Sequence, residues 1–379
     1  MKFSIGYNFD IALLDLLSNY RDHIEALYFA IPDKYLGSGR DSYQPNSYPD
    51  DILKLIDACN SLNMRSQLLI NATCGGKKGL EKKFFSRILT YINQLRNAGL
   101  TSVVTTNLIY IEEFKDKIHG IEVESSVNCY VKTVEHALYL KDLGVDILTL
   151  DRDINRNIAL IKEIKNKTGL KIKIMLNEGC LRNCPFREMH YNYLSHGGSH
   201  ISKLIDSKFG DAFCARVYSK SPEKVLSVPF IPPDALPYYA DVADYYKLTT
   251  RTFPLPMIEA CLKAYINQAF DGNLVELLDC PGVKEGFHSI DYEILKQNDF
   301  FDKLTSCDGE CDECGYCHIL MQEAVIINSD FFLRGYPEKK KEDFITRVGK
   351  KALEIARDGT PVQSKLSNVY SVVKRRLER

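Results

Sequence analysis

Four cysteines lie close together near the C-terminal end of the sequence, with glycines at positions 309 and 315 that allow the backbone to bend between them. Cysteines at such short spacing are typical of the ligands that wrap a cubane iron–sulfur cluster. Tetrahedral zinc is the competing metal, but the ligand pairs of zinc sites are usually separated by a longer loop. The set therefore predicts a 4Fe–4S cluster held by Cys307, Cys311, Cys314 and Cys317.

A second set consists of Cys180 and Cys184, with Cys214 further along the chain. Pro185 suits the first position of a helix, so we expect a helix over 186–194 with both sulfurs on the loop at its positive end. Thiolates are favoured at such a position, which suits metal ligands. Buried apolar packing is the alternative for these cysteines. His190 follows on the same helix, and a pair of Cys180 with His190 could act as nucleophile and base.

Two cations mark the run from 245 to 251. Lys247, Thr249 and Arg251 alternate there, so on a strand all three project to one side. Buried cations need anionic partners, because an unpaired buried charge is very costly. The partner is either an internal carboxylate, with Asp151 and Glu178 as candidates, or the carboxylate or phosphate of a substrate held by the fork of Arg251.

Polar residues follow most of the runs that we predict to be strands, and Asn177 is the one that we select as a candidate catalytic group. Asparagine and threonine at strand ends also start turns and cap helices, so each is informative only as part of the set. The set comprises Asn8, Asn71, Thr73, Cys74, Thr105, Thr106, Asn107, Asn128, Cys129, Asp151, Arg152, Asn177 and Glu178.

The elements that carry these residues repeat one rhythm, a short β-branched run, a turn and an amphipathic helix. Several runs are almost continuously apolar, as expected for parallel strands that are covered on both faces. Eight such units favour a closed (β/α)₈ TIM barrel over an open doubly wound sheet, and no glycine-rich dinucleotide fingerprint follows the first strand. The predicted strands are 3–7, 26–31, 66–70, 102–105, 121–125, 146–150, 171–176 and 245–250, with helices at 49–62, 80–98, 133–143, 155–165 and 254–270.

The repeat of strands and helices also indicates how the chain divides into domains. We predict a barrel over 1–275, interrupted between its seventh and eighth strands by a long cysteine-bearing insertion at 177–243. Long insertions in compact domains are usually functional. The repeat stops at Asp271-Gly272-Asn273, and we assign 276–379 to a C-terminal extension with the iron–sulfur motif and a helical tail at 341–357.

Composition limits the partners and the compartment. The 49 basic and 50 acidic side chains give a net charge of -1, which argues against a nucleic-acid partner, since such proteins normally present a basic face. No window approaches the length of apolar sequence that a membrane span needs, and no signal peptide is visible. We therefore expect a cytoplasmic protein, in which clustered cysteines bind metal more often than they form disulfides.

Taken together, the barrel, the cysteine-bearing insertion after the seventh strand and the run Lys247-Leu-Thr-Thr-Arg251 resemble peptidase family U32, the collagenase-like group. The family's eighth strand ends in a Lys-Ile-Glu-Gly-Arg-type motif, in which Thr249 of this sequence replaces the glutamate. The segments 177–196, 231–239 and 270–278 resemble a less-studied branch of the family. Cys307, Cys311 and Cys314 also match the spacing in radical S-adenosylmethionine enzymes, but those triads follow the first barrel strand, and Glu313 stands where they usually carry an aromatic residue.

The resemblance implies a chemistry that the family name does not. Several members are oxygen-independent hydroxylases that hold a 4Fe–4S cluster through four cysteines of this insertion. Cys180, Cys184 and Cys214 match three of these ligands, and Tyr218 stands near the fourth. Cys129, Cys280 or a histidine could complete the site, or the fourth iron could be open and act as a Lewis acid.

Our first hypothesis is an anaerobic iron–sulfur oxidoreductase with one or two 4Fe–4S clusters, which hydroxylates or otherwise modifies a small molecule or peptide and takes electrons from a donor. Lys247 and Arg251 would hold an anionic group of the substrate. A peptidase, as the family name implies, is the second hypothesis, although no HExxH or Gly-x-Ser-x-Gly motif occurs. A non-catalytic barrel that works with a partner subunit is the third.

Overall fold

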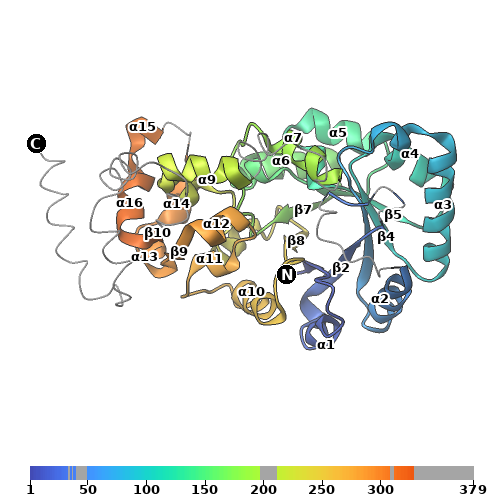
Figure 1. Cartoon of the computed structure of the whole chain (residues 1–379), viewed down its shortest axis with the longest axis horizontal. Coiled ribbons are helices and arrows are strands. Elements are labelled where there is room, and N and C mark those ends of the chain that lie inside the picture. The colour runs from blue at the N-terminus through green and yellow to red at the C-terminus, as the bar shows by residue number, and fades with distance from the viewer. Residues whose placement is uncertain (33–34, 36, 40–48, 197–210, 308–310, 328–379) are drawn as a thin grey trace, which may run out of the picture. The chain divides into compact units, whose positions relative to one another are not determined.

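The computed structural model of the chain describes residues 1–32, 35, 37–39, 49–196, 211–307 and 311–327 (Figure 1). The chain divides into two compact units. One comprises 1–210 and 229–270, and the other comprises 211–228 and 271–379. The predicted helical tail at 341–357 lies outside the described residues. None of the described helices has the length and apolar character needed to cross a membrane.

The first unit is a closed barrel of eight parallel strands, which pair in chain order until β8 closes onto β1. This is the predicted (β/α)₈ architecture, and the predicted strands coincide with the observed ones to within two residues at either end. The strands are β1 Phe3–Gly6, β2 Ile24–Ala30, β3 Arg65–Ile70, β4 Ser102–Thr105, β5 Glu122–Ser125, β6 Ile147–Thr149, β7 Lys171–Met175 and β8 Tyr245–Leu248.

Helices cover the outside of the barrel (Figure 1). In α3, Phe84, Ile88, Ile92 and Leu95 recur at helical spacing and are buried, so this stripe packs the helix on the strands. Polar residues at the strand ends start several of these helices, and Asn107 caps α4 by accepting from the N–H groups of Ile109 and Tyr110. The helices are α1 Leu13–Ser18, α2 Pro49–Ser61, α3 Lys82–Asn97, α4 Leu108–Lys117, α5 Val134–Asp142, α6 Ile158–Thr168 and α10 Leu255–Asn267.

The barrel interior contains a layer of charged side chains in addition to apolar ones. Lys173 is fully buried, and its Nζ lies 2.6 Å from Glu124 Oε2 and 3.4 Å from Glu25 Oε2. Burial acts to raise the pKa of Glu124, but the charges of Lys173 and Lys247 lower it below its usual value. The interior is therefore filled by paired charges and forms no open channel along its axis.

The long insertion after β7 is shared between the two units. Its first part runs through α7 (Arg187–Ser195) and belongs to the barrel, where the Ser195 hydroxyl accepts from the N–H of Thr73 at 2.9 Å. Residues 211–228 belong to the second unit, because α9 (Asp211–Lys220) packs on α12 (Pro281–Gly286) and the 3₁₀ helix Pro222–Ser227 packs on α16 (Tyr316–Ala324). The boundary falls after Phe270, where the repeat of the sequence stops, rather than after residue 275.

The second unit combines short helices with an antiparallel pair of strands, β9 (Phe287–Ile290) and β10 (Val325–Ile327). Its described part shows neither the helical nor the strand period over a long stretch, and besides the helical tail we predicted only the cysteine motif in it. The motif spans α15 (Cys311–Cys314) and the start of α16. The remaining helices are α11 Leu274–Leu277, α13 Tyr292–Gln297 and α14 Phe300–Thr305.

Candidate functional site

The carboxyl ends of the barrel strands surround a pocket of about 440 Å³, a volume that includes space open to solvent. This is the end at which (β/α)₈ enzymes place their catalytic groups. The pocket is lined by Tyr28, Gly39, Leu69, Asn71, Val127, Asn128, Arg152, Met175, Tyr191, Lys247, Thr249 and Arg251.

The eighth strand contributes the two cations that the sequence singled out. Lys247, Thr249 and Arg251 all line the pocket, while Leu248 is fully buried. Lys247 Nζ lies 4.4 Å from the centre of the Tyr28 ring, a cation–π contact. Lys247 enters the pocket from β8, and Arg251 reaches it from the turn that follows the strand, so the predicted strand alternation does not extend to Arg251.

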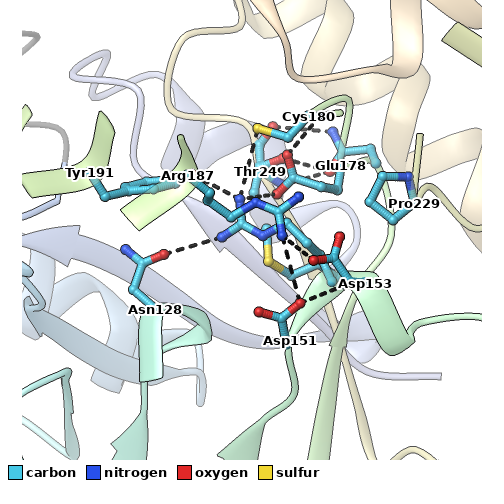
Figure 2. Close-up of polar contacts among 12 residues, drawn as sticks. Asn128, Asp151, Asp153, Glu178, Cys180, Arg187, Tyr191, Pro229 and Thr249 are labelled. Carbon is cyan, nitrogen blue, oxygen red and sulfur yellow. Dashed lines mark hydrogen bonds and ion pairs between the residues drawn. The ribbon is translucent and has the colours of Figure 1, made fainter. Parts of the chain in front are cut away.

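A third cation, Arg152, lines the pocket just after the end of β6. Figure 2 labels Asn128, Glu178, Cys180 and Tyr191 in this part of the site. The Arg152 side chain is completely buried, and Nη1 lies 2.9 Å from Glu178 Oε2. The guanidinium also donates to the Tyr191 hydroxyl at 2.9 Å and to Asn128 Oδ1 at 3.2 Å. Burial acts to lower the pKa of Arg152, but the charges of Glu178, Tyr191 and Cys180 raise it well above its ordinary value.

Glu178 connects this arginine to the first cysteine. One carboxylate oxygen binds Arg152, and the other accepts from the N–H of Cys180 at 3.1 Å. Arg152 Nη1 lies 3.9 Å from Cys180 Sγ, so the sulfur has a cation as its neighbour. A guanidinium beside a half-buried sulfur favours the thiolate form, which is the form that binds metals and attacks electrophiles.

The loop that carries Cys184 is fixed by a second ion pair. Asp153 pairs with Arg187 and accepts from the N–H of Asn183, whose backbone is left-handed. Arg187 also donates to the carbonyl of Leu181 at 2.6 Å. Burial acts to raise the pKa of Asp153, but Arg187 and the N–H of Asn183 outweigh it and lower that pKa to about 2. Both cysteines precede α7, as the sequence predicted.

The two other predicted catalytic residues have different surroundings. Asn177 is fully buried and makes three hydrogen bonds to Thr249, accepting from its N–H and hydroxyl at 2.8 Å and donating to its carbonyl at 3.1 Å. These contacts position the end of β8. His190 lies on α7 with its ring centre 6.1 Å from that of Tyr191. The internal carboxylates expected to pair with Lys247 or Arg251 bind other cations: Glu178 pairs with Arg152, and Asp151 lies within 4 Å of Lys132 and Arg187.

The third cysteine of the insertion, Cys214, belongs to the second unit. A Cβ at Gly282 would lie 3.4 Å from Cys214 Cβ, so α9 and α12 meet at this point. Tyr218 is fully buried on the same helix, with its ring edge-on to Phe287 at 5.3 Å. A core tyrosine therefore occupies the position at which the resemblance suggested a fourth ligand. Cys280, also buried, lies in this unit as well.

Cys129, the other candidate for a fourth ligand, is buried at the end of β5 and donates to the carbonyl of Thr105 at 3.5 Å. Burial raises the pKa of this thiol to about 12, which opposes the thiolate that a metal ligand requires. These surroundings are typical of a cysteine that contributes to packing.

The C-terminal cysteines span two helices, with Gly315 between them in the left-handed conformation. The side chain of Cys311 lies outside the described residues. Among the side chains that the structure does describe, no group of three or more His, Cys, Asp and Glu residues is gathered closely enough to hold a metal ion. Cys214 belongs to a different unit from Cys180 and Cys184, and the Cys311 side chain is not described, so both cluster assignments stay predictions.

Sequence reasoning did not select several residues of the pocket, among them Arg152 and Tyr191. Arg152 was noted only as one of the polar residues at strand ends, and the signal that could have selected it is a charged side chain directly after an apolar strand. Tyr191 follows His190 on α7, and its role depends on how the insertion folds over the barrel. No local pattern marks that contact.

Comparison with known proteins gives a consistent result. The sequence model of peptidase family U32 matches residues 18–181. A protein of Methanocaldococcus jannaschii described as an uncharacterized protease is 33% identical over 300 residues, which cover 79% of this chain and 88% of that protein. The solved structure of the U32 peptidase Mk0906 is 18% identical, with a TM-score of 0.44, over 53% of this chain and 79% of that one.

Proposed function

The chain belongs to peptidase family U32, and from this premise we propose that it is an iron–sulfur enzyme that modifies a small molecule or peptide held by its anionic group in the barrel mouth. The observation that carries the proposal is the convergence of Lys247, Arg251 and Arg152 on one pocket at the catalytic end of the barrel. Arg152 is already paired with Glu178, so Lys247 and Arg251 are the cations that favour an anionic ligand, and the arginine fork favours a carboxylate or phosphate.

The surroundings of Cys180 support the part of the proposal that concerns an iron–sulfur cluster. The sulfur lies beside Arg152, which lines the pocket, and the N–H of Cys180 is bound by Glu178. Bound by cysteine thiolates, an iron–sulfur cluster would supply electron transfer or, through an open iron, Lewis-acid activation. Oxygen-independent hydroxylation, or a related modification, is the reaction that we favour. The role of this chain's own residues is to bind the anion, exclude water and hold Cys180 as a thiolate.

Peptide hydrolysis is the second candidate, because the relative from Methanocaldococcus jannaschii is described as a protease. The same contact supports it, since a thiolate next to a cation can also act as a nucleophile. The two candidates differ in their need for iron. Peptide cleavage that survives complete removal of iron would favour the second candidate.

The anion site is tested by Arg251→Lys, which keeps the charge and removes the fork. We expect binding of acetate and succinate, followed by ligand-observed NMR, to weaken by roughly 10-fold while the circular dichroism spectrum is unchanged. Arg21→Lys is the matched control, because the Arg21 side chain is 56% exposed on the surface. Equal affinities of wild type and Arg251→Lys would remove Arg251 from the site.

A further inference from the structure

A short segment of the loop after β2, Gly37–Gly39, reaches the pocket, which Gly39 lines. Ser38 is fully buried, and its hydroxyl accepts from Arg251 Nη1 at 3.2 Å. Gly39 lines the pocket and donates its N–H to Asn71 Oδ1 at 3.2 Å. The segment is thus bound both to the barrel and to the arginine that we assign to the substrate.

Gly39 lies so close to its neighbours that a side chain would require them to shift. A Cβ at this position would lie 3.2 Å from the carbonyl oxygen of Asn71, 3.3 Å from Asn128 Nδ2 and 3.8 Å from the ring of Tyr191. The first two distances are shorter than ordinary van der Waals contact, and two of the three neighbours are pocket-lining side chains. Gly39 therefore sets how far the pocket extends on this side.

Arg251 is held at two points. Its stem crosses Gly6 at the end of β1, where a Cβ would lie only 2.6 Å from Arg251 Cγ and 2.7 Å from the Tyr28 hydroxyl. Its guanidinium is fixed by Ser38. An arginine restrained in this way presents its fork in one direction, which gives geometric selectivity as well as charge.

The pocket ends inside the barrel. Beneath Lys247 lie Glu124 and Lys173, which are fully paired and buried, and Glu124 experiences the charge of both lysines. A site that is closed below by this ion pair and bounded on one side by Gly39 can admit the end of a molecule. As far as the described residues bound it, the backbone of a polypeptide that continues in both directions cannot pass through such a site.

We infer that the pocket takes a terminal carboxylate, of a small acid or of a peptide C-terminus, and that Ser38 and Gly39 are the residues that determine this specificity. The inference rests on the proposed anion site and deepens it by naming the substrate class. The backbone of an internal peptide segment carries no carboxylate, so such a segment offers one only through an aspartate or glutamate side chain.

The experiment compares three probes on the full-length protein by ligand-observed NMR: N-acetylglycine, its neutral amide N-acetylglycinamide, and tetraglycine with a free C-terminus. We expect the acid to bind at least about 10-fold more tightly than the amide, because the arginine fork then has its bidentate partner. Tetraglycine binding as tightly as N-acetylglycine would identify a peptide C-terminus as the ligand. Binding of N-acetylglycine alone would identify a small acid.

Two variants test the specificity residues. Ser38→Ala removes the acceptor that orients Arg251, and we expect a several-fold loss of affinity for N-acetylglycine. Gly39→Ala should lower the affinity for N-acetylglycine by about 10-fold through contact with the pocket wall. Gly79→Ala is the control, because a Cβ at Gly79 meets nothing within 4 Å. Circular dichroism and the binding of the control verify that each variant is folded.

The outcomes separate this inference from the proposed function. Loss of N-acetylglycine binding in Arg251→Lys, with wild-type binding in both Ser38→Ala and Gly39→Ala, overturns the inference and leaves the anion site in place. Equal binding of acid and amide by the wild type, or no binding of the acid, overturns both.

Discussion

Arg152 and Glu178 form an ion pair of 2.9 Å in which both side chains are essentially excluded from solvent, at 0% and 1% exposure. The pair joins the end of β6 to the start of the insertion, and the two partners each make one further contact to Cys180. These contacts hold Cys180 next to Arg152, which lines the pocket. Loss of the ion pair should therefore lower the stability of the barrel and disturb the pocket together.

Glu178→Gln should destabilise the barrel by about 3–5 kcal/mol, because it leaves the charge of Arg152 buried without its counter-charge. Urea unfolding followed by circular dichroism measures the change. Glu113→Gln is the matched control: Glu113 pairs with Lys117 on the surface of α4, where such a pair contributes at most about 1 kcal/mol. A loss of less than about 1 kcal/mol for Glu178→Gln would show that the buried pair contributes little to stability.

Asp153 makes the stability of the cysteine loop depend on pH. Its folded pKa of about 2 lies below the value of about 3.9 expected in the unfolded chain, so the stabilisation is present above about pH 4 and is lost as the pH falls toward 2. Asp153→Asn should therefore lower stability at pH 7 and flatten its decrease between about pH 4 and pH 2.

Unfolding midpoints measured across this pH range provide the test, with the exposed Asp116→Asn on α4 as the control. If wild type and Asp153→Asn lose stability in parallel between pH 4 and pH 2, the ion pair with Arg187 is not the source of the acid dependence.

Much of the barrel could be predicted from the sequence, because parallel strands covered on both faces are nearly continuous apolar runs. The start of α7 could also be predicted, because Pro185, which directly follows Cys184, favours the first position of a helix. The alternation of Lys247, Thr249 and Arg251 predicted that all three face one side, and all three line the pocket, although Arg251 lies in the turn that follows β8.

The contacts around Arg152 could not be predicted, because they join the ends of β5, β6, β7 and α7, segments that become neighbours only when the barrel closes and the insertion folds back. Tyr218 is a second example. It lies near the position expected for a ligand, but Phe287, which packs against it, is almost seventy residues away in the sequence. The Gly37–Gly39 segment was missed for the same reason, since Ser38 and Gly39 show their role only against Arg251 and Asn71.

Gly6→Ala tests how strictly the direction of Arg251 is determined. The new methyl group would overlap both Arg251 Cγ and the ring of Tyr28, so the arginine must move away from Ser38. We expect carboxylate affinity to fall by about 10-fold or more, with Gly79→Ala again as the control. Unchanged affinity in a folded Gly6→Ala protein would mean that the arginine tolerates several positions.

The claim that the chain is an iron–sulfur enzyme is tested most directly by counting iron and acid-labile sulfide in full-length protein purified without oxygen. We predict equal amounts of the two, about 4 or about 8 of each per chain. The double variant Cys311→Ala, Cys314→Ala should lose the iron of the C-terminal cluster. Cys59→Ala, Cys261→Ala should keep all of it, because both cysteines are buried in helix packing. Anaerobic wild-type protein that contains no iron, or zinc in its place, would contradict the account.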